Sequence, residues 1–301
     1  MSRPGDALVI GRHRPGRPIE STVSDVSQQL RLAGWTVRDK VVERKRDLRG
    51  KTAKAVKSGV DLVVVVGGDG AIAQVATKLV GTDVPLGVIP SGTGNLFAGN
   101  YGIPIDAKEA LATILEGAPK PIDVGMAEVG GKRRAFAIAC GIGFDAHVMD
   151  ATSRTEKVRF GKLAYLVHAL GQTAALKNVQ HTVTLDGTKT TIGAAQVFIA
   201  NAGRMLPMLE PKPPVVPDDG LLDVIVVTAG GPVQALAAAW EATRQDALGE
   251  TDSGRVFRAR ARSIEVRTRK PRLVELDGSV VGETPVRASV VPGGLCVLAP
   301  R

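Results

Sequence analysis

The sequence has few cysteines and few aromatic residues, and these shortages already narrow its function. There are two cysteines, Cys140 and Cys296, and no CxxC pair, which excludes a zinc ribbon and a redox dithiol. Each cysteine lies in an apolar stretch, so we expect buried free thiols in a reducing cytoplasm. Aromatic residues make up 3% of the chain, too few for a surface that stacks single-stranded nucleic acid.

Long hydrophobic runs are also missing. No uncharged apolar run reaches the roughly 18 residues of a membrane-spanning helix, and residues 1–10 contain no signal-peptide core. Hydrophobic residues nevertheless make up 44% of the 301 residues, enough for a sizeable core in one large domain or two smaller ones. The net charge of +9 favours anionic partners such as phosphates, nucleotides, nucleic acid or an acidic membrane.

The first 120 residues or so alternate between strand-like and helix-like segments. The expected strands are Ala7–Ile10, Trp35–Val42, Asp61–Val66 and Val84–Ile89. The expected helices are Thr22–Ala33, Thr52–Lys57, a segment that ends before Gly81, and Ala107–Leu115. This alternation predicts an open parallel sheet with helices on both faces.

The pattern changes near Pro119–Pro121, and the rest of the chain is mainly strand-like. The expected strands are Arg134–Ala139, His181–Leu185, Thr190–Ile192, Gln196–Asn201, Leu222–Val227, Val256–Thr268, Leu273–Leu276 and Ser289–Val291. Two helices are expected among them, at Phe160–Leu176 and Pro232–Leu248. Asp186-Gly187 and Asp277-Gly278 are typical of hairpin turns, so the second half is predicted to be antiparallel β.

Two glycine-rich loops carry the chemistry. The first, Gly67-Gly68-Asp69-Gly70, follows a strand and opens a helix, where backbone N–H groups can bind a phosphate. Asp69 would repel a dinucleotide pyrophosphate but suits a magnesium partner or a general base, although the loop could also be a plain turn. The second loop, Ser91-Gly92-Thr93-Gly94-Asn95, follows the next strand. Because both loops end adjacent parallel strands, together they predict one site for a nucleotide polyphosphate, without a P-loop signature.

The motifs around these loops resemble the diacylglycerol kinase catalytic family, which includes bacterial lipid kinases and sphingosine kinases. The resemblance rests on GGDG after LVVVV and on PSGTGNLFA, and it continues nearly to the end of the chain. The later matching segments are Gly141–Ala146, Glu156–Tyr165, Pro217–Val224, Leu276–Gly278 and Val291–Leu295.

The resemblance implies an NAD kinase/diacylglycerol kinase-like fold with two domains. An α/β ATP-binding domain would span residues 1–121 with a returning strand at 293–301, and a β-rich sandwich domain for the lipid would span 122–292. ATP would bind between them, with Asp69 handling nucleotide, Mg²⁺ and the acceptor hydroxyl.

The resemblance also implies roles for residues outside the loops. Arg159 would lie near the phosphates and Asp145 near the lipid head group, while Asp219 and the carbonyl of Leu221 would hold a structural Mg²⁺. Simpler interpretations are a loop cap for Asp145, a solvated charge for Arg159 and a plain turn at Asp218-Asp219-Gly220.

Three positions depart from the family pattern. Ser279 stands where the family has a glutamate that is a proposed proton acceptor, and Ala71 stands where it has a threonine. The loop Gly11–Gly16, which follows the first expected strand, is more basic than the corresponding loop of the family and lacks its asparagine. All three departures concern the predicted cleft and bear on the acceptor and the rate.

A basic stretch runs from Arg255 to Arg272. Arg258, Arg260 and Arg262 alternate, so we expect them on one strand face, as a membrane-facing patch or as an ordinary solvated surface. Nucleic acid is not expected as a partner, because no nucleic-acid motif accompanies the charge.

Together these features predict an ATP- and Mg²⁺-dependent lipid kinase that phosphorylates a hydroxyl such as that of diacylglycerol. We expect a cytoplasmic protein with peripheral membrane association, and a homodimer is left open. The alternatives are a catalytically weak nucleotide- or lipid-binding relative and an NAD-kinase-like enzyme for a soluble alcohol.

Overall fold

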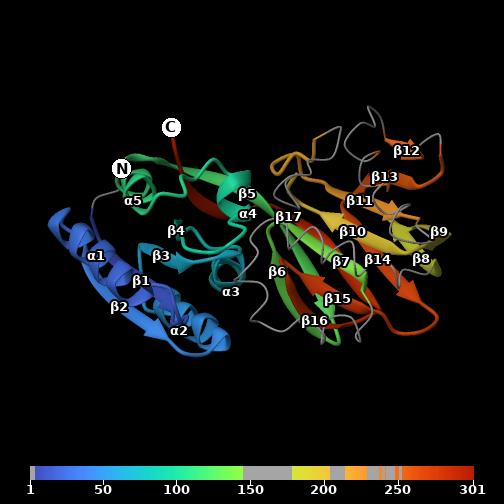
Figure 1. Cartoon of the computed structure of the whole chain (residues 1–301). Helices are drawn as coiled ribbons and strands as arrows, with labels where there is room; N and C mark the ends of the chain where they lie inside the picture. Colours follow the sequence, from blue (N-terminus) through green and yellow to red (C-terminus); the bar gives the residue numbers. More distant parts are fainter. Residues whose placement is uncertain are drawn as a thin grey trace.

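The computed structural model describes residues 4–144, 178–203, 214–228, 237–238, 241, 248–250 and 253–301. Two layered parts lie side by side, an α/β part formed by the first half of the chain and a sandwich of two β-sheets (Figure 1). The predicted combination of a parallel α/β part and an antiparallel β-rich part is confirmed.

The α/β part contains a parallel sheet with the strand order β2-β1-β3-β4. Its strands are β1 (Asp6–Arg12), β2 (Thr36–Val42), β3 (Leu62–Gly67) and β4 (Leu86–Pro90). Its helices are α1 (Ile19–Leu32), α2 (Lys45–Lys57), α3 (Asp69–Leu79), α4 (Leu96–Asn100) and α5 (Ala107–Glu116). Helix α2 begins seven residues before the predicted start at Thr52. The prediction missed this start because the first turns are charged and show little apolar periodicity.

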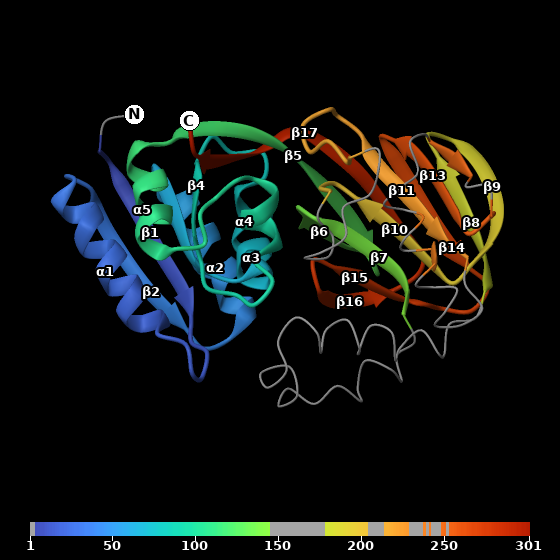
Figure 2. The same cartoon turned by 45° about the horizontal axis from the view of Figure 1, so that its top comes forward.

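The helices cover both faces of this sheet. A side chain at Gly11 would meet α1, and one at Gly87 would meet Ile114 of α5, so α1 and α5 share one face. Helices α2 and α3 pack against each other on the other face (Figure 2). Strand β3 lies between these layers and is buried along its whole length, which explains its unbroken run of apolar residues.

The second part is a β-sandwich. One sheet contains β5 (Ala118–Val129), β6 (Lys132–Phe136), β8 (Val179–Leu185), β9 (Thr188–Ala194), β14 (Ser263–Thr268) and β17 (Val286–Ala299). The other contains β7 (Ala139–Phe144), β10 (Gln196–Ala200), β11 (Leu222–Val227), β12 (Gly249–Glu250), β13 (Val256–Ala261), β15 (Leu273–Leu276) and β16 (Ser279–Glu283). Apolar side chains from both sheets form one buried core between them.

Strands β5 and β17 join the two parts. They pair antiparallel from Val129 to Ala118, with a register shift in β17 between Val291 and Leu295. Strand β17 also pairs with β4 in the α/β part and with β14 in the sandwich, so a single 10-stranded sheet runs through both parts. The change of pattern near Pro119–Pro121 falls within β5, which contains both prolines.

The predicted strand Val256–Thr268 is wrong as one element. It is two strands that separate at Arg262, and β13 and β14 belong to different sheets of the sandwich. The predicted strand Arg134–Ala139 likewise spans the end of β6 and the first residue of β7. The expected helix Phe160–Leu176 lies outside the described residues, as does most of Pro232–Leu248.

Both cysteines are free thiols, and Cys140 is buried while Cys296 is half-buried. Among the described residues, no helix is long and apolar enough to cross a membrane.

Candidate functional site

The two glycine loops meet at the carboxyl edge of the parallel sheet. Strands β3 and β4 pair in register up to Gly67 and Pro90, so the loops begin side by side. The Ser91 N–H donates to the Gly67 carbonyl at 3.0 Å. A Cβ added to Gly68 would lie 2.7 Å from the Cα of Gly92, closer than two carbons can approach. Glycine is therefore required for the backbones to touch here.

Asp69 ties the first loop to the second. It begins α3, and its Oδ1 accepts a hydrogen bond from the Phe97 N–H at 2.8 Å, which satisfies a backbone donor in the first turn of α4. Among the described residues, Oδ2 accepts no hydrogen bond, and it lies 3.4 Å from where a Cβ of Gly94 would be. One carboxylate oxygen thus holds the loops together and the other faces the second loop.

The second loop is held in shape by Asn95. This residue is buried, adopts the left-handed conformation with φ of 47°, and accepts a hydrogen bond at Oδ1 from the Gly92 N–H at 2.8 Å. Thr93 and Gly94 are exposed at the tip. The buried hydroxyl of Ser91 has no hydrogen-bond partner among the described residues. A buried hydroxyl without a partner, beside backbone glycines, fits a site that receives phosphate oxygens.

Lys45 is a candidate that the sequence reasoning missed. Its Nζ lies 2.5 Å from Ser279 Oγ, and 2.9 Å from where a Cβ of Gly70 would be. Burial lowers the pKa of Lys45, and the charges of Arg12 and Arg49 lower it further. Lys45 lies in a charged run that matches none of the motifs above. However, it follows β2 at the same sheet edge as the glycine loops, and that signal was available.

Asp277 does more than form the predicted hairpin turn. The turn is present, since Asp277 and Gly278 both have positive φ between β15 and β16. In addition, its carboxylate accepts hydrogen bonds of 2.9–3.0 Å from the N–H groups of residues 137–139. Burial raises the pKa of Asp277 to about 6 against the effect of these bonds, and the charge of Asp69 raises it too.

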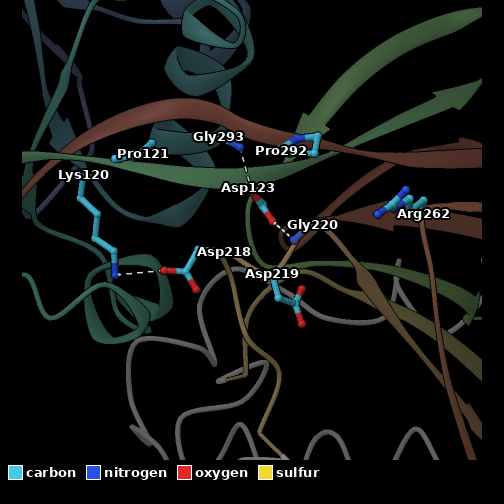
Figure 3. Close-up of a pocket in the computed structure, with 9 residues that line it drawn as sticks. All are labelled: Lys120, Pro121, Asp123, Asp218, Asp219, Gly220, Arg262, Pro292 and Gly293. Carbon is cyan, nitrogen blue, oxygen red and sulfur yellow. Dashed lines mark hydrogen bonds and ion pairs between the residues drawn. The ribbon is translucent and has the colours of Figure 1, made fainter.

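Asp219 lies in a separate cavity of about 570 Å³ where the two parts meet (Figure 3). Its Oδ1 accepts the Leu221 N–H at 3.0 Å, and its Oδ2 lies 3.6 Å from a guanidinium nitrogen of Arg260. The carboxylate of the neighbouring Asp123 accepts hydrogen bonds from the N–H groups of Gly220 and Gly293, at 2.6 and 2.8 Å. In the described part of the chain, no group of three metal-ligating side chains is present.

The predicted site residues fall into three sets. The two loops bring together Gly67, Gly68, Asp69, Gly70, Ser91, Gly92, Thr93, Gly94 and Asn95. Asp219 lines the other cavity and accepts a hydrogen bond from the N–H of Leu221. Asp145 and Arg159 lie outside the described residues.

The expected face of alternating arginines is confirmed for Arg258 and Arg260 but is wrong for Arg262, and Arg258 is buried. Its guanidinium is buried in a bidentate contact with one carboxylate oxygen of Asp223, at 2.8 and 2.5 Å. Arg260 also reaches Asp223, at 3.4 Å, whereas Arg262 is exposed after the end of β13. On this face of β13, Asp223 pairs with both Arg258 and Arg260.

Comparisons with known proteins agree with this architecture. Residues 7–127 match the diacylglycerol kinase catalytic domain, and residues 139–299 match the YegS C-terminal NAD kinase beta sandwich-like domain. A diacylglycerol kinase of Mycobacterium tuberculosis is 32% identical over 85% of this chain and 82% of its own length.

Two further relatives show the extent of the likeness. An uncharacterized protein of Synechocystis sp. is 29% identical over 88% of this chain, which spans 60% of that protein's length. The crystal structure of a diacylglycerol kinase from Bacillus anthracis superposes with a TM-score of 0.74 over 99% of this chain and 98% of its own, at 22% identity. At that identity, the superposition establishes the fold alone.

Proposed function

Because the chain belongs to the diacylglycerol kinase family, we propose that it is an ATP- and Mg²⁺-dependent lipid kinase. It transfers the γ-phosphate to a lipid hydroxyl such as that of diacylglycerol. The family acts by moving a phosphoryl group to an alcohol, and the site suits that reaction. The observation that carries the proposal is the backbone contact between Gly68 and Gly92, with the Asp69 carboxylate bridging the two loops.

The phosphates of the nucleotide bind to the two loops. Backbone N–H groups at the start of α3 donate to phosphate oxygens, and the Ser91 hydroxyl, which has no partner among the described residues, becomes satisfied. Thr93, Gly94 and Asn95 close the second loop over the same region. Lys45 beside Gly70 adds a positive charge. Phosphoryl transfer depends mainly on positioning and charge stabilisation, which is what these groups offer.

Asp69 takes the proton of the acceptor alcohol or holds a nearby cation. Its Oδ1 is fixed by the Phe97 N–H, so Oδ2 keeps a defined direction toward the second loop. A bound Mg²⁺ would neutralise charge on the phosphates during transfer. Asp145 on the lipid side and Arg159 near the phosphates complete the proposal, and Asp219 with the Leu221 carbonyl is proposed to hold a structural Mg²⁺.

We further propose the division of labour between the two parts. Residues 1–121 with 293–301 bind ATP, and residues 122–292 bind the lipid. A lipid acceptor brings the protein to a membrane surface, and the net charge of +9 supports attraction to anionic lipid.

A specific observation favours one alternative, a nucleotide-binding relative with little turnover. Ser279 stands at the position that carries a glutamate in the family, and its hydroxyl accepts a hydrogen bond from Lys45. This position therefore supplies no carboxylate to accept the proton of the acceptor alcohol, and in this alternative the protein binds the nucleotide with slow turnover.

The test is Asp69→Asn. An asparagine Oδ1 can still accept the Phe97 N–H, so the loops stay joined while the negative charge is lost. We expect turnover to fall at least about 100-fold, the usual contribution of a general base. Phosphate transfer is measured on a panel of lipid and soluble alcohols. The matched control is Asp25→Asn, which removes an exposed carboxylate from α1.

Three outcomes would count against parts of the proposal. Full activity of Asp69→Asn excludes Asp69 as the base. Calorimetric binding of Mg-ATP by the wild type without transfer to any acceptor favours the weakly catalytic relative. Transfer to soluble alcohols in the absence of lipid and detergent favours a soluble acceptor.

A further inference from the structure

Helix α2 carries a concentration of positive charge on the outside of the α/β part. Its 13 residues include six basic side chains and one acidic side chain, so this helix holds +5 of the chain's net +9. The other helices that the structure describes are neutral or carry a net charge of −1. Much of the net positive charge is therefore gathered on one helix. Its basic residues are Lys45, Arg46, Arg49, Lys51, Lys54 and Lys57.

Three of these lysines form a ridge on the solvent side of α2. The helix packs on α3, β1 and β2 through a buried stripe that includes Leu48 and Thr52 (Figure 1). Lys51, Lys54 and Lys57 are exposed. Because they follow one another at a spacing of three, neighbouring lysines lie side by side on the helix surface. At 1.5 Å per residue the helix is about 20 Å long, so this α2 ridge is an extended cationic surface.

The neighbouring strand β2 extends the surface. Arg38 donates a hydrogen bond to Ser58 Oγ at 3.2 Å, just past the end of α2, so its side chain lies on the α2 side of the sheet. Lys40, two residues later in β2, is exposed on the same side. The residue between them, Asp39, lies on the opposite side, where it pairs with Arg31 of α1. The strand therefore adds its two cations to the α2 surface and places its carboxylate elsewhere.

The protein itself does little to neutralise this surface. Among the described residues, no ion pair involves a lysine of the α2 ridge, and the ion pair within α2 joins Arg46 to Asp47 at 3.9 Å. Arg38 has one acidic partner, Asp6, at 3.4 Å. A further carboxylate, that of Glu43, lies before the first turn of α2 and not along the ridge. The ridge is thus complementary to an extended anionic surface.

We propose that the α2 ridge, together with Arg38 and Lys40, is the surface by which the protein docks on an anionic membrane. A bilayer presents many phosphate charges in one plane and so meets these cations together. Each basic residue close to such a surface strengthens binding by roughly a factor of five. A nucleic acid fits less well, because few aromatic residues and no nucleic-acid motif accompany the charge. The choice of partner rests on the proposed function, in which the acceptor is a lipid.

Docking through α2 brings the candidate site to the membrane. The helix that carries the ridge begins at Lys45, whose Nζ lies 2.5 Å from Ser279 Oγ. Beside the start of α2, Val280 of β16 is 44% exposed, and an apolar side chain there can enter the lipid interface. The ridge therefore determines which edge of the protein faces the bilayer, and this edge keeps a lipid acceptor within reach of the site.

The test is cosedimentation of the full chain with phosphatidylglycerol vesicles, without nucleotide. The ridge variant combines Lys51→Gln, Lys54→Gln and Lys57→Gln, and glutamine has nearly the helix propensity of lysine. We expect the affinity for these vesicles to fall at least about tenfold, because three charges close to the lipid are lost. Wild type should bind uncharged phosphatidylcholine vesicles at least about tenfold more weakly than phosphatidylglycerol vesicles.

A matched control removes the same net charge away from α2. It combines Lys108→Gln on α5, Lys189→Gln on β9 and Lys270→Gln after β14, and all three lysines are exposed. At an ionic strength of about 0.1 M, charges more than about 10 Å from the lipid are largely screened, so the control should bind within about threefold of wild type.

Two results of the vesicle assay would overturn the proposal. One is equal weakening by the ridge variant and the control, which would make the attraction a property of the net charge. The other is no binding of wild type to phosphatidylglycerol vesicles. If wild type instead binds duplex DNA and the ridge variant does not, the ridge belongs to a nucleic acid and the membrane is excluded.

The orientation on the membrane gives a second readout that does not depend on the ridge variant. Gly50→Cys places a dye on α2 where a side chain meets nothing within 4 Å, and Lys189→Cys places it on β9, each in a Cys296→Ala background. Phosphatidylglycerol vesicles with nitroxide head groups should quench the dye at position 50 at least about twice as strongly as the dye at position 189. Equal quenching, or stronger quenching at position 189, would refute docking through α2.

The failure of this proposal and the failure of the proposed function can be told apart. Neither vesicle experiment involves phosphoryl transfer. Vesicle binding through the ridge without transfer to any alcohol refutes the lipid kinase and leaves the docking surface in place. Transfer to a lipid without binding to anionic vesicles refutes the docking surface and leaves the kinase in place.

Discussion

Replacing Gly92 by alanine tests the contact on which the candidate nucleotide site depends. The new Cβ would lie 2.7 Å from the Cα of Gly68 and 2.7 Å from Oδ1 of Asn95. Non-bonded carbons rest at about 3.5–4.0 Å, so one loop has to move by about 1 Å. The partner atoms are a backbone carbon and a buried side chain, and neither can swing aside freely.

The cost follows from two effects. Overpacking of this kind costs about 1–3 kcal/mol. The clash with Asn95 also removes its hydrogen bond from the Gly92 N–H, worth about 1 kcal/mol. We expect Gly92→Ala to lower the free energy of unfolding by about 2–4 kcal/mol and to weaken Mg-ATP binding at least tenfold, since 1.4 kcal/mol corresponds to about a factor of ten.

The assays are urea unfolding and calorimetric titration with Mg-ATP, and α2 provides a matched control. Gly50 lies inside that helix, and a Cβ there would meet nothing within 4 Å. Gly50→Ala should therefore raise the free energy of unfolding by about 0.5–1 kcal/mol and leave ATP binding unchanged. If Gly92→Ala keeps wild-type stability and affinity, the contact between the loops does not have the importance assigned to it.

Two further predictions concern buried charges. Arg258→Met should cost about 3–5 kcal/mol in urea unfolding, because it leaves the buried Asp223 carboxylate with only Arg260 among the partners described here, and a loss below about 1 kcal/mol would contradict this. For Asp277, burial raises the pKa from 3.8 to about 6, so the folded protein holds more protons between these values and the stabilisation by this carboxyl is lost as pH rises through about 6. The unfolding free energy of the wild type should therefore fall by about 1–3 kcal/mol relative to Asp277→Asn between about pH 4 and pH 7, and a difference independent of pH would refute the buried state of this carboxyl.

The meeting of the glycine loops could be predicted because it depends on topology alone. Once β3 and β4 are recognised as neighbouring parallel strands, their carboxyl ends must adjoin, and glycine at positions 68 and 92 permits contact. The bond from Phe97 to Asp69 could not be predicted, since it depends on the direction in which the second loop turns into α4.

Contacts between distant segments account for most of what was missed. Lys45 is placed at the site by its hydrogen bond to Ser279, which lies 234 residues later in the chain on a hairpin of the other part. The burial of Arg258 could not be predicted, because its partner Asp223 lies on β11 and the pairing of β11 with β13 is not evident from the sequence. The chain passes from one sheet to the other at Arg262, within a run of uniformly strand-like residues. Local strand propensity therefore could not predict where the run divides into two strands.

The position of β17 has a consequence for the order of events during synthesis. One edge of β4 is covered by β17, where Val297 pairs with Leu86, 211 residues earlier (297 − 86). At roughly 5–20 residues per second, that edge waits on the order of 10–40 s for its partner strand. Its residues, Leu86–Pro90, are all buried in the finished fold, and an open apolar edge invites pairing with other chains. The yield of folded protein should therefore depend on how well this edge is protected before the last strand is made.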